Sequence, residues 1–335
     1  MFAKQKIFSN FSFTNVMGPN CSGDAVSEIL LKNIIYNTMK IRVLIVALFI
    51  LVYVNVNAQR VVIIGLDGFS TEGFNGSKHP NIDRLFEKGL ITLTNRPVMP
   101  SITLPNWTSH LTGQGPEEHG ITANNWTMEN HILKAIETDE QGYSPSIFKV
   151  FKDKKNNAKT AFYYNWAELI NPINKKYLDE VSFEEGDRYK DNYAKALKFI
   201  EKNKNDPTLV FLYSVHTDHA GHEYGWMSPQ YITAIEEVDV EIGNFIDKLK
   251  EQKLYDDTYF LFITDHGGIK KGHGGVTMNE MQIPWAITGP KIKNLGLTDQ
   301  FFNSNKNTSL VLAKLFGLKN IPKSWTGIAP IVIFK

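Results

Sequence analysis

Residues 61–68, VVIIGLDG, form a continuous apolar run that ends directly in an acidic residue and a glycine. A run without polar alternation is typical of a strand that is buried on both faces, and such strands belong mainly to parallel sheets covered by helices. The stretch therefore predicts a parallel α/β sheet, with Asp67 at the carboxyl end of one of its strands.

Other segments alternate between strand and helix patterns. Strands are predicted at 160–164, 209–213, 258–264 and 284–288, and helices at 80–89, 103–111, 228–249 and 307–316. Ser228 and Pro229 match a typical helix start, an N-cap serine followed by proline at the first helical position. The alternation predicts the class: an α/β fold with a mostly parallel central sheet and helices on both faces. The stretch from about 126 to 206 is rich in Lys, Asn and Tyr and is expected to include a small insertion over the site.

The start of the chain differs from the rest. Residues 43–54, VLIVALFILVYV, form a short apolar run that follows Lys40 and Arg42 and precedes Ala58. This order of basic, apolar and small residues is typical of a cleaved secretory signal peptide. The run is also shorter than the roughly 20 residues of a spanning helix, although a buried strand or an uncleaved anchor is an alternative.

We therefore expect three parts. Residues 1–38 are interpreted as an upstream extension, because Met39 directly precedes the basic segment, and residues 39–58 as the signal peptide. Residues 59–335 are expected to form a single catalytic domain, exported to the periplasm or secreted, with no stable membrane anchor after cleavage. The sequence does not indicate the oligomeric state.

Composition limits the chemistry. The chain is 42% hydrophobic with a formal net charge of +1, so it is globular, and nothing suggests binding to a nucleic-acid polymer. The only cysteine, Cys21, lies in the expected extension. The mature chain would then lack disulfides, and any metal ion would need oxygen and nitrogen ligands.

Acidic and histidine residues cluster in two segments, HTDHAGH at 216–222 and DHGGIKKGHGG at 265–275. Asp67, Asp218 and Asp265 each lie at or shortly after a predicted strand end, and in parallel sheets these ends share one edge. Carboxylate and imidazole ligands together suit borderline divalent ions such as zinc. A lone Asp–His pair would more simply be structural, but the convergence of three segments predicts a metal site.

A third cluster spans residues 97–121, PVMPSITLPNWTSHLTGQGPEEHGI. Thr103 and Asn106 lie at the start of the helix expected to reach about Leu111. Helix starts present free N–H groups that suit a phosphoryl group. A threonine there can be a simple N-cap; a nucleophilic role would need a metal ion to lower the pKa of its hydroxyl.

Taken together, these motifs resemble the alkaline phosphatase superfamily, in particular its type I phosphodiesterase/nucleotide pyrophosphatase branch. The resemblance is carried by LDGFS at 66–70, HPNIDRLFEKG at 79–89, RPVMPSITLPNWTSHLTGQGPEEHGI at 96–121, HTDHAGHEYG at 216–225, TDHGGIKKGHGG at 264–275 and IPWAITGP at 283–290.

The resemblance implies two zinc ions, although other divalent ions also suit the ligands. One ion would activate Thr103, which would itself contact that ion, and would be bound by Asp67, Asp265 and His266. The other would be bound by Asp218, His222 and His273. His273 follows Asp265 much more closely than in vertebrate relatives, so His216 and His219 are alternatives.

The resemblance also implies a reaction. Thr103 would form a covalent phosphothreonine that water hydrolyses, and Asn106 would stabilise charge on the phosphoryl oxygens. The substrate would be a small phosphate ester or nucleotide, cleaved at a phosphodiester or pyrophosphate bond. A phosphomonoesterase or phosphonate hydrolase is the main alternative, and a catalytically inactive binding protein is the non-enzymatic one.

Specificity depends on further side chains. Extra cations would favour monoesters, and stacked aromatic rings would favour nucleotides. The candidates for these roles are Lys154, Lys155 and Lys159 for charge, and Trp126, Tyr163, Tyr164 and Trp166 for stacking.

Overall fold

The computed structural model describes residues 28, 31–42 and 59–335, except residue 187. It divides into two compact units, Met1–Val56 and Asn57–Lys335. In the first unit, residues 31–42 are helical and exposed, while the apolar run of the expected signal peptide lies outside the described residues. Within the described ranges, no helix combines the length and the apolar character needed to cross a membrane. The boundaries at residues 38 and 58 stay predictions.

An eight-stranded sheet organises the second unit, in the order β4-β3-β5-β1-β6-β7-β2-β8. Neighbouring strands pair in parallel except for β7, which is antiparallel to both β6 and β2. The strands are β1 (Arg60–Leu66), β2 (Leu90–Asn95), β3 (Lys159–Tyr164), β4 (Glu180–Phe183), β5 (Thr208–Ser214), β6 (Thr258–Ile263), β7 (Ile283–Thr288) and β8 (Gly296–Leu297). The predicted class, α/β with a mostly parallel sheet, is confirmed.

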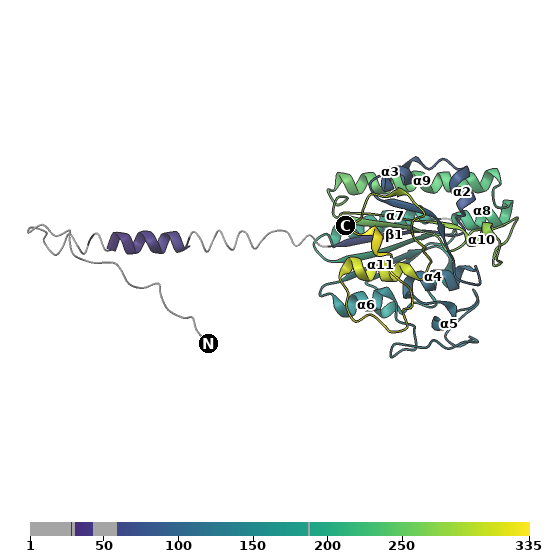
Figure 1. The fold of residues 1–335 in the computed structure, drawn as a ribbon, viewed down its shortest axis with the longest axis horizontal. Coiled ribbons are helices and arrows are strands. Elements are labelled where there is room, and N and C mark those ends of the chain that lie inside the picture. Colours follow the sequence, from purple (N-terminus) through teal and green to yellow (C-terminus); the bar gives the residue numbers. More distant parts are fainter. Residues whose placement is uncertain (1–27, 29–30, 43–58, 187) are drawn as a thin grey trace, which may run out of the picture. The chain divides into compact units, whose positions relative to one another are not determined.

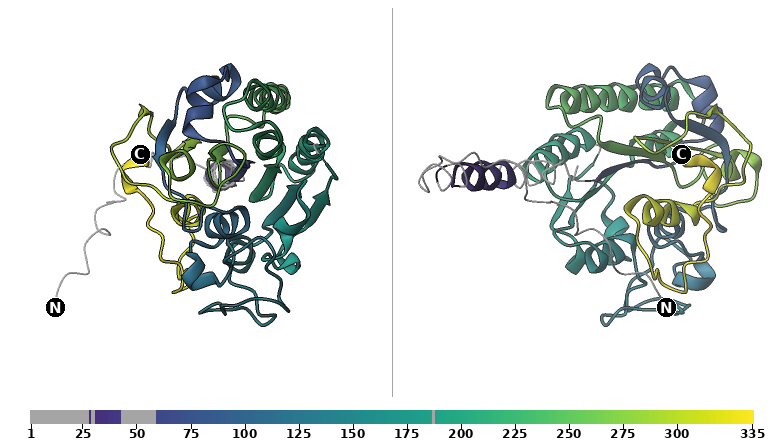
Figure 2. Two further views of the ribbon diagram at one scale, coloured as in Figure 1. Left: turned by 90° about the vertical axis from the view of Figure 1, so that its right-hand side faces the viewer. Right: turned by 60° about the vertical axis from the view of Figure 1, so that its left-hand side comes forward.

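Helices cover both faces of this sheet. Figure 1 shows α3 and α9 on one side and α4, α6 and α11 on the other, and the two views of Figure 2 agree. The helices are α2 (Thr71–Gly76), α3 (Pro80–Phe86), α4 (Thr103–Thr112), α5 (Pro116–His119), α6 (Ile147–Lys154), α7 (Tyr189–Lys202), α8 (His216–Tyr224), α9 (Pro229–Glu251), α10 (Met278–Met281) and α11 (Asn307–Phe316). The Ser228 hydroxyl accepts from the Tyr231 N–H, so it caps α9 as predicted.

Strand β1 separates two hydrophobic cores. Val61 and Ile63 point into a core shared with α4, α6 and α11, while Val62 and Ile64 point into a core shared with α3, α7 and α9. All seven β1 residues are buried. The continuous apolar sequence of this strand therefore follows from its position, because neither face meets water.

Much of the polar stretch at 126–206 belongs to the sheet rather than to an insertion. β3 pairs with β5, and Thr160 lies opposite Leu209. β4 is an edge strand whose residues alternate between partly buried and exposed, and α6 and α7 carry polar outer faces. Edge strands and surface helices need polar residues on one side, which explains the composition that suggested an insertion.

The carboxyl ends of three strands lie side by side. Leu66 of β1 is in register with Ser214 of β5, and Gly65 of β1 with Ile263 of β6. The segments that follow these strands therefore emerge together, and they contain the acidic residues that the sequence singled out.

One glycine is required where β1 approaches α4. A Cβ atom on Gly65 would lie 2.7 Å from Cη2 of Trp107 and 3.3 Å from Cε2 of Phe211. Gly65→Ala should therefore lower the free energy of unfolding by about 1–3 kcal/mol through overpacking, measured by urea denaturation.

The matched control is Gly272→Ala, where no heavy atom lies within 4 Å of the added Cβ. This variant should leave stability unchanged or raise it by up to about 1 kcal/mol. Equal urea midpoints for the two variants would contradict the close packing at Gly65.

Candidate metal centre

Three buried carboxylates meet at the carboxyl edge of the sheet. Asp67 follows β1, Asp265 follows β6, and Asp218 lies in the first turn of α8. In each, one buried oxygen lacks a hydrogen-bond partner among the described residues: Oδ1 of Asp67, Oδ1 of Asp218 and Oδ2 of Asp265. Because an ionised oxygen without a partner is costly to bury, this pattern indicates a site for cations.

The remaining oxygens hold the carboxylates in orientation. Oδ2 of Asp67 accepts hydrogen bonds from the Tyr213 hydroxyl and, at 3.2 Å, from Nε1 of Trp107. Oδ1 of Asp265 accepts from the Gly68 N–H at 3.1 Å. Partners behind a ligand commonly fix its direction and strengthen metal binding.

Three histidines are oriented in the same way, with Nδ1 on a backbone carbonyl. The contacts are His222 to Lys271 O (3.0 Å), His266 to Gly267 O (2.8 Å) and His273 to Ser101 O (3.0 Å). A carbonyl can only accept, so Nδ1 carries the proton and Nε2 of the neutral ring offers a lone pair. That tautomer is the one required for metal binding through Nε2.

Each of these Nε2 atoms faces a carboxylate. It lies 3.1 Å from Oδ2 of Asp265 in His266, 3.5 Å from Oδ2 of Asp218 in His222, and 3.8 Å from Oδ1 of Asp218 in His273. The His266 and His273 rings also stack, with centroids 3.7 Å apart. All six predicted metal-binding side chains therefore converge on one region.

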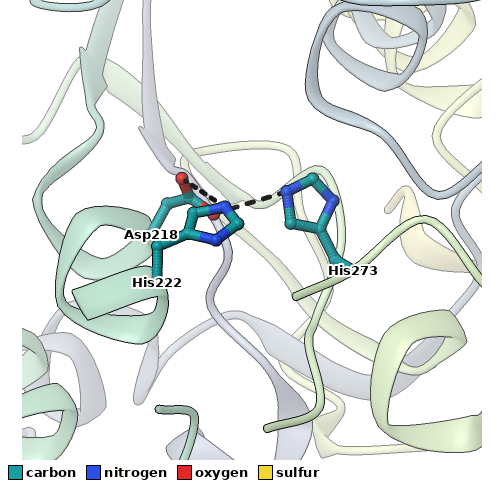
Figure 3. A group of neighbouring side chains, drawn as sticks. All are labelled: Asp218, His222 and His273. Atoms are coloured by element: carbon teal, nitrogen blue, oxygen red, sulfur yellow. Dashed lines mark ion pairs between the residues drawn. The ribbon is translucent and has the colours of Figure 1, made fainter. Parts of the chain in front are cut away.

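The donor atoms form two overlapping groups. Asp67, Asp218 and His266 make one, and Asp218, His222 and His273 make the other, with all donor atoms of a group within 4.8 Å of one another. Figure 3 shows the second group, in which α8 supplies Asp218 and His222. Asp218 faces both groups, whereas the resemblance assigned it to one ion. His216 instead pairs with Glu237 at 2.9 Å and belongs to neither group.

The raised pKa values of the three carboxyl groups also indicate a site that favours positive charge. Burial, followed by the charge of Asp218, raises the pKa of Asp67 to about 8. Burial raises the pKa of Asp218 to about 7 and that of Asp265 well above its ordinary value. Burial also lowers the pKa of His266, which stays neutral. With protein atoms alone the carboxylates resist ionisation, so the donor set fits divalent cations of the zinc type.

Thr103 lies beside these ligands. It is the first residue of α4, is 5% exposed, and its hydroxyl lies 3.2 Å from Nε2 of His266. The N-cap of this helix is Ile102, so the Thr103 side chain is not used as a cap. The hydroxyl is instead available at the edge of the site.

Asn106 does not have the contacts expected of a phosphoryl-binding group. It is fully buried, and Oδ1 accepts from the Val98 N–H (2.7 Å) and from Nδ2 of Asn305 (2.9 Å). Its Nδ2 faces the carbonyls of Val98, Pro100 and Ile102. Both N–H bonds are thus engaged within the loop that precedes Thr103, which does not fit the predicted contact with phosphate.

Another asparagine has a free donor near the nucleophile. Oδ1 of Asn124 accepts from the N–H of Leu104, the residue after Thr103, at 2.8 Å. Asn124 is partly buried, and its Nδ2 has no hydrogen-bond partner in the described part of the chain. No local sequence pattern indicated this residue, because it lies in an irregular loop outside the helix that carries Thr103.

The predicted specificity residues separate into two regions. Lys159 begins β3, and Lys154 and Lys155 precede it, so all three lie near the amino end of that strand, opposite the metal site. Tyr163 is fully buried in the core. Trp166 follows the carboxyl end of β3 and packs with Trp126 against Leu104.

The fold is that of the alkaline phosphatase superfamily, as the comparisons with known proteins show. The model of the type I phosphodiesterase / nucleotide pyrophosphatase family matches residues 61–281. The chain belongs to this family, which confirms the resemblance in the sequence motifs.

Individual proteins with similar sequences also carry the name of this family. A pyrophosphatase/phosphodiesterase of Schizosaccharomyces pombe, described as uncharacterized, is 30% identical over 223 residues, 64% of this chain and 45% of the relative. Human ectonucleotide pyrophosphatase/phosphodiesterase family member 1 is 29% identical over 218 residues, 61% of this chain and 23% of the relative. The chain thus covers less than half the length of either relative.

A solved structure shares the fold. Murine ectonucleotide pyrophosphatase/phosphodiesterase 5, an inactive variant in complex with AMP, superposes with a TM-score of 0.65. The alignment covers 79% of this chain and 96% of that protein, at 16% sequence identity.

The raised carboxyl pKa values predict a pH dependence of stability for the metal-free protein. Between pH 6.5 and 8 the folded state retains protons on Asp67 and Asp218 that the unfolded chain has released, so stability should fall as pH rises. Buried histidines with lowered pKa values oppose this trend most strongly below about pH 6.5, the ordinary pKa of imidazole, and their effect fades by about pH 7.5.

The measurement is thermal unfolding in chelator at pH 6.5, 7 and 8. The melting temperature should decrease across this series, and saturating zinc should remove the decrease because bound carboxylates are ionised and compensated. A melting temperature that rises with pH in chelator would contradict the electrostatic account.

Proposed function

We propose that this chain is an exported metal-dependent phosphohydrolase that cleaves phosphodiester or nucleotide pyrophosphate bonds of small substrates, using two zinc ions. The observation that supports this most directly is the set of three unpartnered carboxylate oxygens and three unprotonated imidazole nitrogens beside one threonine hydroxyl. Asp67, Asp265 and His266 would hold the ion near Thr103, and Asp218, His222 and His273 the other.

In the proposed reaction, Thr103 Oγ1 attacks the phosphorus atom and the bond to the leaving group breaks, which yields a phosphothreonine. The proton lost by the Thr103 hydroxyl passes through solvent to the leaving oxygen. Water then attacks the same phosphorus, the bond between phosphorus and Oγ1 breaks, the phosphate product leaves, and a proton from the water restores the Thr103 hydroxyl. When bound, the zinc ions would lower the pKa of the hydroxyl and neutralise charge on the attacking and leaving oxygens. At the helix start, the Thr103 N–H is the backbone donor that would face a phosphoryl group, because the Leu104 N–H is bonded to Asn124 and Pro105 has no N–H.

We assign the amide that binds a phosphoryl oxygen to Asn124 rather than Asn106, because only Asn124 keeps a free N–H pair near Thr103. Its other end is fixed by the Leu104 N–H, so the donor is held in place before substrate binds.

Asn124→Ala should lower kcat by about 10²-fold, the typical effect of removing one such donor, while the protein stays folded. Asn106→Ala should instead lower the melting temperature, because it leaves loop groups at 98–102 unpaired. Steady-state kinetics and thermal unfolding on both variants check the assignment. The reverse pattern would return the role to Asn106.

Nucleotide substrates are favoured by the comparisons with relatives and by the positions of the predicted specificity residues. The relatives are named as nucleotide pyrophosphatases, and the structural neighbour binds AMP. The cations proposed for monoester recognition lie at the opposite end of the sheet, whereas Trp166 lies at the same edge as the site, where a ring can stack on a base.

Export is proposed from the signal-peptide pattern of residues 39–58 and from the ectonucleotide name of the relatives.

The central test compares hydrolysis of bis-nitrophenyl phosphate and mononitrophenyl phosphate by the zinc-loaded protein. We expect the diester to be preferred. Thr103→Ala should lower kcat by at least about 10³-fold, because the nucleophile is lost. A strong monoester preference would support the phosphomonoesterase alternative.

The matched control is Thr112→Ala, in the last turn of the same helix; among the described residues, the Thr112 hydroxyl bonds only to Thr108 O. It should keep wild-type kcat. Full activity in Thr103→Ala, or activity indifferent to chelator and to zinc, would refute the mechanism.

A further inference from the structure

Asn305 lies outside the family match at 61–281, two residues before α11, in the segment NSNKNTS at 303–309. Its side chain is fully buried, with 0% exposure. A buried amide must satisfy its donors and its acceptor within the protein, so its partners show what the residue connects.

Those partners lie on three other segments. Oδ1 accepts from Nδ2 of Asn95, the last residue of β2, at 2.7 Å. Nδ2 donates to Oδ1 of Asn106 in α4 at 2.9 Å and to the backbone carbonyl of Asp265 at 3.0 Å. One amide group therefore joins β2, the nucleophile helix and the metal-binding segment after β6.

The contact with Asn106 extends to the nucleophile. Asn106 engages the Val98 N–H and the carbonyls of Pro100 and Ile102, so it shapes the loop that ends at Thr103. Asn305 also bonds to the carbonyl of the peptide group that joins Asp265 to His266. Nε2 of His266 lies 3.2 Å from the Thr103 hydroxyl. The two hydrogen bonds donated by Asn305 therefore reach the nucleophile helix and the segment that carries Asp265 and His266. The proposed reaction depends on the distance between these two segments.

We propose that Asn305 is a positioning residue that sets the distance between the Thr103 hydroxyl and the ligands Asp265 and His266. This rests on the proposed function. A nucleophile misplaced by about 1 Å can cost 10²-fold in rate, so a rigid connection between these segments serves catalysis directly. Asparagine suits the position because it offers two donors and an acceptor, whereas the isosteric aspartate offers no donor when ionised.

A second connection makes the arrangement more rigid. Trp107, the neighbour of Asn106 in α4, donates from Nε1 to Oδ2 of Asp67 at 3.2 Å. Helix α4 is therefore tied to the end of β1 through Trp107 and to the segment after β6 through Asn305. Nε2 of His110 in α4 also bonds to the carbonyl of Thr264, the residue before Asp265, at 3.0 Å. Loss of Asn305 would leave these contacts but would remove the one that joins Asn106 to the Asp265 peptide, so the helix start could shift relative to Asp265 and His266.

The test is Asn305→Asp, which keeps the shape and removes both donors, in zinc-loaded protein acting on bis-nitrophenyl phosphate. We expect kcat to fall about 10- to 100-fold while KM changes by less than about threefold, because the loss concerns alignment rather than substrate binding.

The control is Asn307→Asp, the same change in the same buried segment. The Asn307 side chain donates to Asn303 Oδ1 and accepts from the Ile328 N–H, and among the described residues it forms no hydrogen bond with the nucleophile loop or with Asp265. Both variants should lose melting temperature, but Asn307→Asp should keep kcat within about twofold of wild type. Equal kcat losses in the two variants, or wild-type kcat in folded Asn305→Asp, would overturn the proposal.

A milder variant covers the case in which Asn305→Asp does not fold. Asn95→Ala removes the Asn95 anchor on Asn305 and leaves both donated hydrogen bonds in place, so it should lower kcat several-fold at unchanged KM. Wild-type kcat in this variant, together with a misfolded Asn305→Asp, would assign Asn305 to structure alone.

A readout that does not need turnover separates this inference from the proposed function. Crystal structures of the wild type and Asn305→Asp should differ by more than about 0.5 Å in the Thr103–His266 distance, the tolerance for a working site. If the wild type fails to hydrolyse either substrate, the proposed function is wrong. An unchanged distance in Asn305→Asp would refute the positioning role by itself.

Discussion

Three carboxylates enclosed at one sheet edge are the constraint on which the rest of this structure depends. Asp67, Asp218 and Asp265 are each at least 93% buried, and each leaves one oxygen without a hydrogen-bond partner in the described part of the chain. Their mutual repulsion and desolvation can be relieved by protons or by cations. The three histidines, each with its proton on Nδ1, provide neutral donors that favour cations.

The fold places these groups at little conformational cost. β1, β5 and β6 are adjacent and parallel, so the residues after them emerge at one edge without long excursions of the chain. The two cores on either side of β1 hold this edge rigid, and Trp107 links one of them to the carboxylate of Asp67. Core side chains such as Trp107 therefore stabilise the fold and also orient a carboxylate of the site.

The sequence predicted the sheet, and the six side chains predicted as ligands lie close together, because both features leave local patterns. β1 is apolar throughout since both faces are buried, and Asp67 and Asp265 follow strand ends directly. The roles of Asn106, Asn124 and Asn305 could not be predicted in this way. An asparagine can cap, bridge or bind substrate, and only tertiary contacts show which groups its amide meets. The edge strand β4 was missed for a related reason, because its exposed face carries polar residues that resemble those of a loop.

The short loop that carries His273 has a consequence for assembly of the site. One stretch of chain carries Asp265, His266 and His273, and it contacts α8 and the residues after it. A Cβ on Gly268 would lie 2.1 Å from Cε2 of Trp226, which follows α8, and Nζ of Lys271 donates to the carbonyl of Glu223 in α8. Bringing Asp265, His266 and His273 together closes only a small loop, which costs little chain entropy, whereas Asp67 and Asp218 meet them only after distant strands have paired. The sheet should therefore pair before a metal ion can be bound by all six side chains together.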